Sequence, residues 1–299
     1  MASIISHQTE STDLQDIVKA TKARINGMAD LSETERDDLL NILDGLCEFE
    51  LGRFLLQNGG GWNGEWTHRI ISHREDTRHE LHPLEEFTIF SAPSVLATRE
   101  RFSIFQQQTQ RLLKEGCHLA SVPCGVMADL LTLDFTELEQ FQLTGIDLDE
   151  QAFPLAEKLA AEKGLSEHCQ WIAADAWKLD VYGEFDVLTS NGLNIYQSDN
   201  VLVISLYQQF RQAIKPGGTL ITSFLTPPPD AQGHTAWNLD AINIEDLLQQ
   251  QKVMAHVLQA TWACFQTEEA TRQQLHEAGF EEIDIHWGSS RMFPTVVAR

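Results

Sequence analysis

A carboxylate at the end of an apolar run has the clearest chemical use in this chain. Thr144–Gly145–Ile146 leads into Asp147 about twenty residues after the turn Val122–Pro123–Cys124–Gly125, an interval typical of a nucleoside-binding βαβ unit. In such a unit the carboxylate accepts hydrogen bonds from both ribose hydroxyls, and the turn lets the ligand approach the backbone. The spacing therefore predicts that Asp147 binds a ribose. The alternative is that Asp147 caps the next helix, a role that suits Asp149 better.

The segments around Asp147 alternate between strand and helix patterns. We expect strands over 118–122, 141–147, 169–174, 185–190 and 219–225, and helices over 150–163 and 201–214. This alternation predicts an α/β fold with a doubly wound, mostly parallel sheet, whose ligands bind beyond the carboxyl ends of the strands. Two final strand-like runs, 281–287 and 293–298, predict an antiparallel C-terminal hairpin and bring the sheet to seven strands.

Residues 1–115 carry helical patterns and no strand pattern. Ser32 and Glu35 form a capping box, which opens a long amphipathic run that ends at Gly59–Gly60–Gly61. We expect a helical N-terminal cap over 1–115 and a core over 116–299. Within the core, Pro227–Pro228–Pro229 cannot continue a strand and begins an insertion over about 226–262, with a helix expected over 244–261.

The net charge and the cysteine content indicate which kinds of partner the protein can bind and in which cellular compartment it works. The chain has 21 Lys and Arg against 44 Asp and Glu, a net charge of −23, and such a field repels phosphate backbones and anionic lipid. The five cysteines form no CxxC pair, which favours a reducing cytosol. A signal-peptide pattern and the run of roughly 18 apolar residues of a membrane span are both missing. We therefore expect a cytoplasmic protein that binds neither nucleic acid nor membrane.

Residues 118–225, with the terminal helix and hairpin, resemble the class I S-adenosylmethionine-dependent methyltransferases. Four segments match later motifs of that family in order and spacing: Gly145–Asp149, Ala173–Trp177, Phe185–Asn191 and Lys215–Leu220. The first motif of the family, an acidic residue followed by spaced glycines, retains only Gly125. Ser121 stands at the acidic position, and Pro123 and Met127 stand at the outer glycines.

The resemblance implies a binding site for S-adenosyl-L-methionine. In it, Asp147 binds the ribose hydroxyls and Leu148 lies against adenine, while Asp175 accepts from the adenine amino group and the Ala176 amide meets a ring nitrogen. A solvated loop position is the alternative for Asp175, and an ordinary core position is the alternative for Trp177. The implied cofactor-binding residues are Pro123, Cys124, Gly125, Asp147, Leu148, Asp175, Ala176, Trp177 and Asn191.

The methyl acceptor is expected beyond the fourth strand, near Asn191, Asn194 and Tyr196. This segment differs from the Asn/Asp-Pro-Pro-Tyr tetrad of relatives that methylate bases and glutamines, which favours a small or medium-sized metabolite. Trp66 and His234 are further substrate-side candidates. Trp66 belongs to the glycine-rich segment 58–69. This pattern is typical either of a flexible lid or of a connection between helices whose Trp side chains pack on the core. His234 belongs to the insertion and is otherwise a surface residue.

Other reactive residues carry weaker expectations. The histidines between 68 and 82 match no zinc motif, so no metal is expected. Cys124 has no paired histidine that would make it a nucleophile. Arg99 and Arg101 could pair with a carboxylate of cofactor or substrate, or with surface acids. No catalytic base is assigned, because a neutral nitrogen nucleophile needs none whereas a hydroxyl does.

The function expected from the resemblance is S-adenosylmethionine-dependent methyl transfer by in-line displacement to a small or medium-sized metabolite. The alternative is a protein of the same fold that binds S-adenosylmethionine without transferring the methyl group. Aminopropyl transfer ranks lower, because Ser190–Asn191 replaces the acidic residues of those relatives. An NAD dehydrogenase also ranks lower, because the chain lacks a G-x-G-x-x-G motif. The oligomeric state stays open.

Overall fold

The computed structural model describes residues 13–73, 75–260 and 264–299. By packing, these residues divide into two compact units: the described residues up to 96 with 239–260, and 97–238 with 264–299. We call them the helical unit and the sheet unit. The extreme N-terminus, where a signal peptide was not expected, and the end of the helix expected over 244–261 lie outside the described residues.

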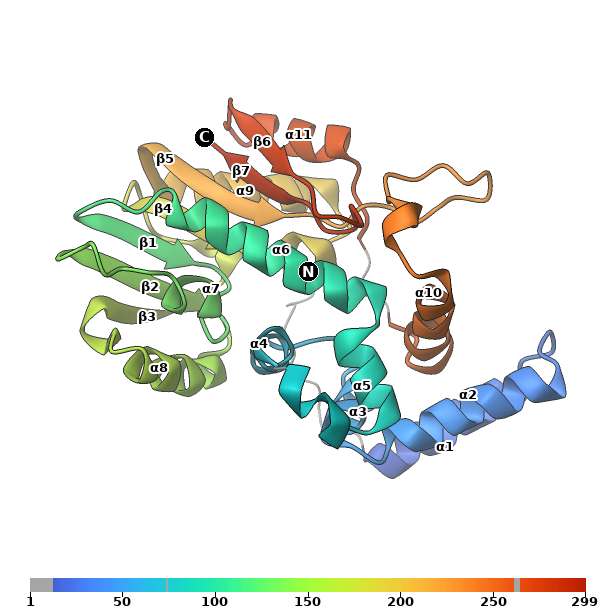
Figure 1. The fold of residues 1–299 in the computed structure, drawn as a ribbon. Coiled ribbons are helices and arrows are strands. Elements are labelled where there is room, and N and C mark those ends of the chain that lie inside the picture. The colour runs from blue at the N-terminus through green and yellow to red at the C-terminus, as the bar shows by residue number, and fades with distance from the viewer. Residues whose placement is uncertain (1–12, 74, 261–263) are drawn as a thin grey trace. The chain divides into compact units, whose positions relative to one another are not determined.

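The sheet unit contains a seven-stranded sheet, as predicted (Figure 1). Its strand order is β3-β2-β1-β4-β5-β7-β6. The strands are β1 (Cys117–Ser121), β2 (Phe141–Asp147), β3 (Cys169–Ala173), β4 (Phe185–Ser190), β5 (Ile214–Ser223), β6 (Ile283–His286) and β7 (Thr295–Ala298). β1 to β5 pair in parallel, whereas β7 runs antiparallel to both β5 and β6. The predicted fold class is therefore confirmed.

Helices cover both faces of this sheet because its strands are apolar on both sides. The helices are α6 (Pro93–Gln110), α7 (Ala128–Leu131), α8 (Phe153–Glu162), α9 (Asn200–Ala213) and α11 (Glu268–Glu277). In Figure 1, α6 crosses the face of the sheet turned to the viewer and α9 lies behind it. Alternate strand residues serve the two layers: Leu119 packs with Phe105 of α6, whereas Leu188 packs with Phe210 of α9. Burial on both faces is what a doubly wound sheet requires.

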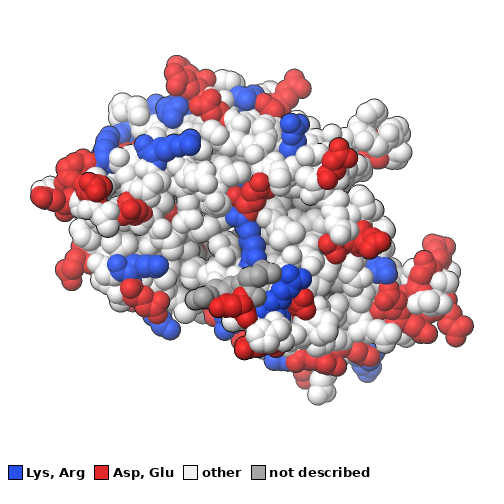
Figure 2. All heavy atoms as spheres, viewed as in Figure 1, with Lys and Arg blue, Asp and Glu red and all other residues white. Residues whose placement is uncertain are grey.

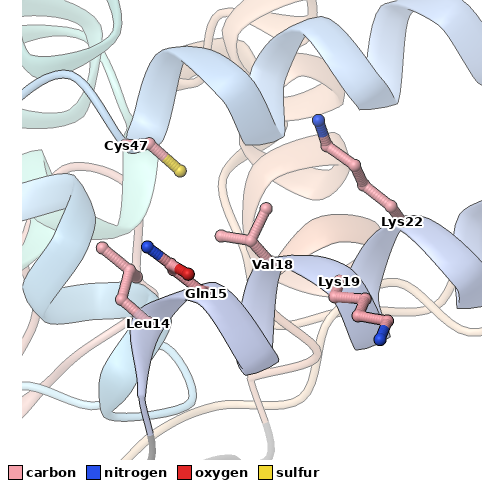
Figure 3. A pocket seen from close by; sticks show the side chains of 6 residues that line it. All are labelled: Leu14, Gln15, Val18, Lys19, Lys22 and Cys47. Atoms are coloured by element: carbon pink, nitrogen blue, oxygen red, sulfur yellow. The ribbon is translucent and has the colours of Figure 1, made fainter.

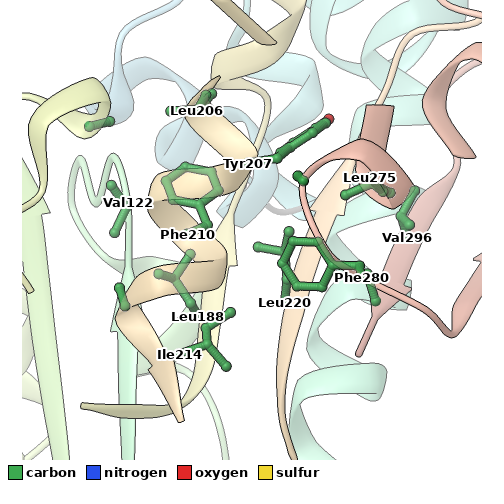
Figure 4. Close-up of a cluster of buried hydrophobic side chains, with 14 of the residues drawn as sticks. Val122, Leu188, Leu206, Tyr207, Phe210, Ile214, Leu220, Leu275, Phe280 and Val296 are labelled. Carbon is green, nitrogen blue, oxygen red and sulfur yellow. The ribbon is translucent and has the colours of Figure 1, made fainter. Parts of the chain in front are cut away.

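The largest core cluster lies between the sheet and the layer formed by α9 and α11 (Figure 4). Its fully buried side chains include Tyr207 and Phe210 of α9, Leu275 of α11 and Leu220 of β5. Asp199 caps the start of α9 by accepting from the Val201 amide at 2.8 Å. This layer fixes β4 and β5, whose carboxyl ends carry the expected substrate side.

The helical unit differs from expectation in where its helices break. Its elements are α1 (Leu14–Asn26), α2 (Glu33–Leu46), α3 (Glu50–Gln57), α4 (Gly64–Ser72), α5 (Pro83–Phe90) and α10 (Ile244–Gln251), with the 3-10 turn η1 (Glu75–Glu80) and the π-helical turn η7 (Lys252–Val257). The capping box of Ser32 and Glu35 is present. The amphipathic run that it opens splits at Phe49, which is extended, because α3 folds back on α2. A Cβ on Gly52 would lie 2.1 Å from the Leu46 carbonyl oxygen, so only glycine fits there.

The insertion expected over 226–262 divides between the two units. Residues 226–238 stay with the sheet unit, where the Asn238 side-chain amide donates to the Ser289 carbonyl at 3.1 Å. Residues 239–260 pack in the helical unit, where Arg24 donates to the carbonyls of His256 and Val257, each at 2.7 Å. The helical region likewise gives up residues 97–115 to the sheet unit, because α6 from Ala97 onward packs on the strands.

The length and polarity of the helices bear on membrane insertion. Within the described part of the chain, every helix is too short or too polar to cross a lipid bilayer.

We predict that Phe210→Ala lowers the free energy of unfolding by about 3–5 kcal/mol, the usual cost of emptying a fully buried phenylalanine site. The matched control is Val201→Ala on the same helix, where the side chain is 70% exposed and the change should stay within about 0.5 kcal/mol. Guanidinium denaturation followed by circular dichroism measures both variants. Equal effects of the two substitutions would contradict the core described here.

Candidate functional site

The expected site residues gather at the carboxyl edge of the sheet. Parallel pairing places Ser121 of β1 beside Gly145 of β2 and Thr189 of β4, and pairs Asp147 with Ala173 of β3. From β1 the chain proceeds outward to β2 and β3, then returns to β4 on the other side of β1. The strand order therefore reverses between β1 and β4, the point where ligands bind in open α/β sheets.

Asp147 joins the end of β2 to the turn after β1. Its Oδ2 accepts from the Gly125 amide at 2.8 Å and its Oδ1 accepts from the Asp149 amide at 3.0 Å. Burial raises the pKa of Asp147, while the two amides act in the opposite direction. Each oxygen retains a lone pair for a further donor. Next to it, Leu148 is 47% exposed and offers an apolar surface. Asp149, as expected, caps the following turn by accepting from the Gln151 amide.

The turn after β1 keeps glycine-like geometry at two positions. Gly125 has φ 50° and Met127 has φ 54°, although Met127 carries a side chain. Such a conformation is uncommon outside glycine and costs on the order of 1–3 kcal/mol. The Cys124 amide donates to the Ile146 carbonyl at 2.9 Å, and the Val122–Pro123 peptide bond is cis. Burial, with Asp147 and Asp129 nearby, raises the pKa of the Cys124 thiol, so the thiol stays protonated and is not a nucleophile.

A second carboxylate, Asp129, lies buried behind this turn. It lies in the first turn of α7 and accepts from the Ser121 hydroxyl at 3.0 and 3.1 Å and from the Thr189 hydroxyl at 2.6 Å. Asp129 thus connects the ends of β1 and β4 through α7. Burial raises the pKa of Asp129, and the two hydroxyl donors partly offset that effect. The acidic group that Ser121 lacks is supplied from eight residues farther along the chain.

The residues after β3 form hydrogen bonds with nearby backbone groups and pack against the core. Asp175 caps a short 3-10 turn, η4 (Ala176–Lys178), by accepting from the Trp177 amide at 3.0 Å. Trp177 packs against the α9 core and donates its indole N–H to the Leu202 carbonyl at 2.8 Å. Ala176 is buried. The adenine contacts of these three residues stay predictions.

A buried polar cluster lies at the ends of β4 and β5. Asn194, in the 3-10 turn η5 (Leu193–Tyr196), donates its amide to the Ser223 carbonyl at 3.0 Å, and Arg101 of α6 donates to the Ser223 hydroxyl at 3.3 Å. The side-chain oxygens of Asn191 and Asn194 are buried and form no hydrogen bond within the described structure. Burial raises the pKa of Tyr196, and Arg101 acts against that effect. The substrate-side candidates Asn191, Asn194 and Tyr196 therefore belong to one strand-end neighbourhood.

The other two substrate-side candidates lie outside this cluster. Trp66 is on α4, capped by Asn63, and is buried in the core of the helical unit with Phe54 at 5.5 Å between ring centroids. The glycine segment is thus shorter than 58–69, because α4 begins at Gly64. His234 lies in a surface turn, 82% exposed, with Nδ1 3.1 Å from the Asp230 carboxylate. Contact of Trp66 or His234 with substrate stays a prediction.

Two further features of the structure do not coincide with the strand-end residues. A hollow of about 450 Å³ is lined by residues of α1 and the end of α2 (Figure 3): Leu14, Gln15, Val18, Lys19, Lys22 and Cys47. Among the residues that the structure describes, no group of three or more His, Cys, Asp or Glu side chains could hold a metal ion.

The sequence interpretation missed Asp129 and Thr189, and it left Arg101 undecided. Asp129 did carry a signal, since it is the only acid within the apolar run Val126–Leu131. Charged side chains inside apolar runs are buried and paired, or they serve a function.

We predict that Asp129→Asn changes the pH dependence of stability. The folded-state pKa of Asp129 is raised above its usual 3.8, so the folded state binds this proton more tightly than the unfolded state does. The wild type should then lose stability relative to Asp129→Asn as pH rises from about 4 through the folded-state pKa. Urea denaturation of both proteins between about pH 4 and 8 measures this difference.

Asp134→Asn is the matched control, because hydrogen bonds with Thr136 lower the pKa of this exposed carboxylate. Its difference from the wild type should therefore stay constant between about pH 4 and 8 and should change only as pH falls below about 4. A difference between wild type and Asp129→Asn that stays constant with pH would refute the burial argument for Asp129.

Comparison with known proteins finds a methyltransferase domain in this chain. A methyltransferase-domain family matches residues 124–218. The crystal structure of a possible exported protein from Bordetella parapertussis is 43% identical, with 100% of this chain and 99% of that chain covered and a TM-score of 0.90. None of the curated proteins compared with this chain matches it.

Two more distant structures share the fold. A candidate O-methyltransferase from Nostoc punctiforme is 16% identical over 73% of this chain and 60% of its own, with a TM-score of 0.50. The apo form of the S-adenosylmethionine-dependent methyltransferase SibL is 15% identical over 94% of this chain and 73% of its own, with a TM-score of 0.52. Residues 124–218 therefore contain a methyltransferase domain, and the sheet has the fold of S-adenosylmethionine-dependent methyltransferases.

Proposed function

We propose that this protein transfers the methyl group of S-adenosylmethionine to a small or medium-sized metabolite. The observation that carries the proposal is the Asp147 carboxylate, held at the end of β2 by the Gly125 amide of the turn after β1. This pairing puts a ribose acceptor beside a turn that a ligand can approach, at the point where the strand order reverses. The methyltransferase-domain match spans these same elements.

The residues at this edge fit the cofactor. Asp147 would hold the ribose hydroxyls through the lone pairs that its amide bonds leave free, and the exposed Leu148 would cover the adenine ring. Asp175 has one oxygen engaged by the Trp177 amide, and its second oxygen, which lies 3.7 Å from the exposed Lys178 ammonium, would meet the adenine amino group. The turn Pro123–Cys124–Gly125 would hold the amino acid end, and the Asn191 side-chain oxygen, which is buried without a hydrogen bond, is left for the acceptor.

The protein's part in the reaction is alignment and exclusion of water. Bound S-adenosylmethionine supplies the activated methyl group, and transfer by in-line displacement needs the acceptor opposite the departing sulfur. Asn191 and Asn194 can accept hydrogen bonds from the acceptor at the end of β4. Burial raises the pKa of Tyr196, so its phenol is suited to donate a hydrogen bond to the acceptor and not to act as a base. The nucleophile best served is one that arrives neutral or already ionised.

Charge supports a small acceptor. Figure 2 shows Asp and Glu side chains spread over the visible face with Lys and Arg between them, consistent with the net charge of −23. Such a surface disfavours a polyanionic substrate. That the protein acts in the cytoplasm, without nucleic-acid or membrane partners, stays a prediction.

One observation favours the alternative of cofactor binding without transfer. The turn after β1 has Ser121, Pro123 and Met127 where the family has an acid and glycines, and these residues adjoin the cofactor's amino acid end. If they displace that end, the methyl group would not point at the acceptor.

Two measurements test the proposal. The first is calorimetry with S-adenosylmethionine and with S-adenosylhomocysteine. No binding at about 1 mM would contradict both the methyltransferase and the alternative of cofactor binding without transfer. Incubation with methyl-labelled S-adenosylmethionine and a small-molecule cell extract comes second. Label transferred to a metabolite supports the methyltransferase. Tight binding with no transfer to any extract fraction favours the alternative.

We predict that Asp147→Ala weakens binding of S-adenosylhomocysteine by about 1–3 kcal/mol, because charge-assisted hydrogen bonds to the ribose are lost. The matched control is Glu150→Ala, an exposed carboxylate three residues away, which should leave the affinity unchanged. Isothermal titration calorimetry measures both. An unaltered affinity of Asp147→Ala would mean that the ribose binds elsewhere.

A further inference from the structure

Arg101 is a buried cation without an acidic partner among the residues that the structure describes. Arg101 is only 6% exposed. Its Nη1 donates to the Ser223 hydroxyl at 3.3 Å, and its guanidinium lies 5.2 Å from the centroid of the Phe293 ring. Its Nε is buried and has no hydrogen-bond partner. The planar guanidinium thus keeps an unused donor.

The fold gains little from such a charge. Moving an unpaired guanidinium out of water costs several kcal/mol, and an apolar side chain of similar volume is often neutral or more stable in its place. Burial lowers the pKa of Arg101 to about 10, so the group remains charged at neutral pH. A buried, charged and incompletely bonded group is expected where a ligand completes it.

The surroundings of Arg101 indicate which part of the site it serves. A Cβ on Gly192, just after β4, would lie 3.7 Å from Nη1, and Ser223 ends β5. The bare oxygens of Asn191 and Asn194 belong to the same strand ends. The described contacts of Arg101 are with these segments and the one before β7, and none is with the Gly125 turn or Asp147.

We propose that Arg101 binds a carboxylate of the methyl acceptor, so that the substrate is a small organic acid. The inference rests on the function proposed above and names its substrate class. A carboxylate accepts two parallel hydrogen bonds from a guanidinium, which would use the free Nε–H. The Asn191 and Asn194 oxygens would accept from an N–H or O–H of the same molecule, which places its nucleophile at the end of β4.

The test uses Arg101→Met, a neutral side chain of similar length, on the full-length protein. Calorimetry first measures S-adenosylhomocysteine binding. The saturated protein is then titrated with acetate and benzoate, and with acetamide and benzamide as neutral counterparts, at matched ionic strength. The wild type should bind the acids at least about tenfold more tightly than the amides, and Arg101→Met should lose this preference. Arg111→Met, an exposed arginine beyond the same helix, should keep it.

Each other outcome has a separate meaning. Failure of the wild type to prefer acids, or an equal preference in Arg101→Met, overturns the inference. Weaker S-adenosylhomocysteine binding by Arg101→Met with unchanged acid binding means that Arg101 serves the cofactor's own carboxylate, which also overturns it. No S-adenosylhomocysteine binding by the wild type overturns the proposed function instead. Arg101→Met should melt no lower than the wild type. If it fails to fold, Arg101→Lys, which keeps the charge without the planar donors, should still show a weakened acid preference.

Discussion

The hydrogen bond from the Gly125 amide to the Asp147 carboxylate is the contact on which the rest of the site depends. It joins the turn after β1 to the end of β2, two segments that parallel pairing has already brought to one edge. Because an amide donor stabilises a carboxylate, the bond offsets part of the cost of burying Asp147. It also fixes the orientation of the carboxylate, so that its remaining lone pairs stay available to a ligand. Loss of this bond would release both the turn and the ribose acceptor.

The altered turn keeps its shape by other means than glycine. Met127 retains the left-handed conformation, which a buried methionine side chain can support by packing. Ser121 is not acidic, and the carboxylate behind the turn is instead that of Asp129, which accepts hydrogen bonds from hydroxyls of β1 and β4. The strand ends on both sides of the reversal point are therefore connected through α7. A carboxylate is still present behind the turn, although the chain delivers it from the following helix.

The sequence predicted the sheet because its signals are local. Buried parallel strands read as short apolar runs between turn residues, and Asp147, Asp175 and Asn191 follow such runs directly. What it missed depends on contacts between distant parts of the chain. The break at Phe49 follows from the close approach of Gly52 to Leu46, and the packing of residues 239–260 with α1 and α2 depends on Arg24 reaching their carbonyls. Periodicity carries no information about either. The roles of Asp129 and Arg101 likewise appear only once α7 and α6 are packed on the strands.

Asp129 and Arg101 are both buried and ionisable, but the protein satisfies the hydrogen-bonding groups of Asp129 and not those of Arg101. This difference indicates a structural role for Asp129 and a ligand-binding role for Arg101. Asp129 is bonded by Ser121 and Thr189, so its polar atoms are satisfied within the protein. Arg101 has a single hydroxyl acceptor and an aromatic ring, and its Nε–H remains unused, as do the side-chain oxygens of Asn191 and Asn194 after β4. The Arg101 guanidinium lacks an acceptor, and the Asn191 and Asn194 oxygens lack donors. A ligand that carries both a hydrogen-bond acceptor and hydrogen-bond donors would therefore complement these groups. Such unfinished bonding lowers stability and is retained where a ligand finishes it.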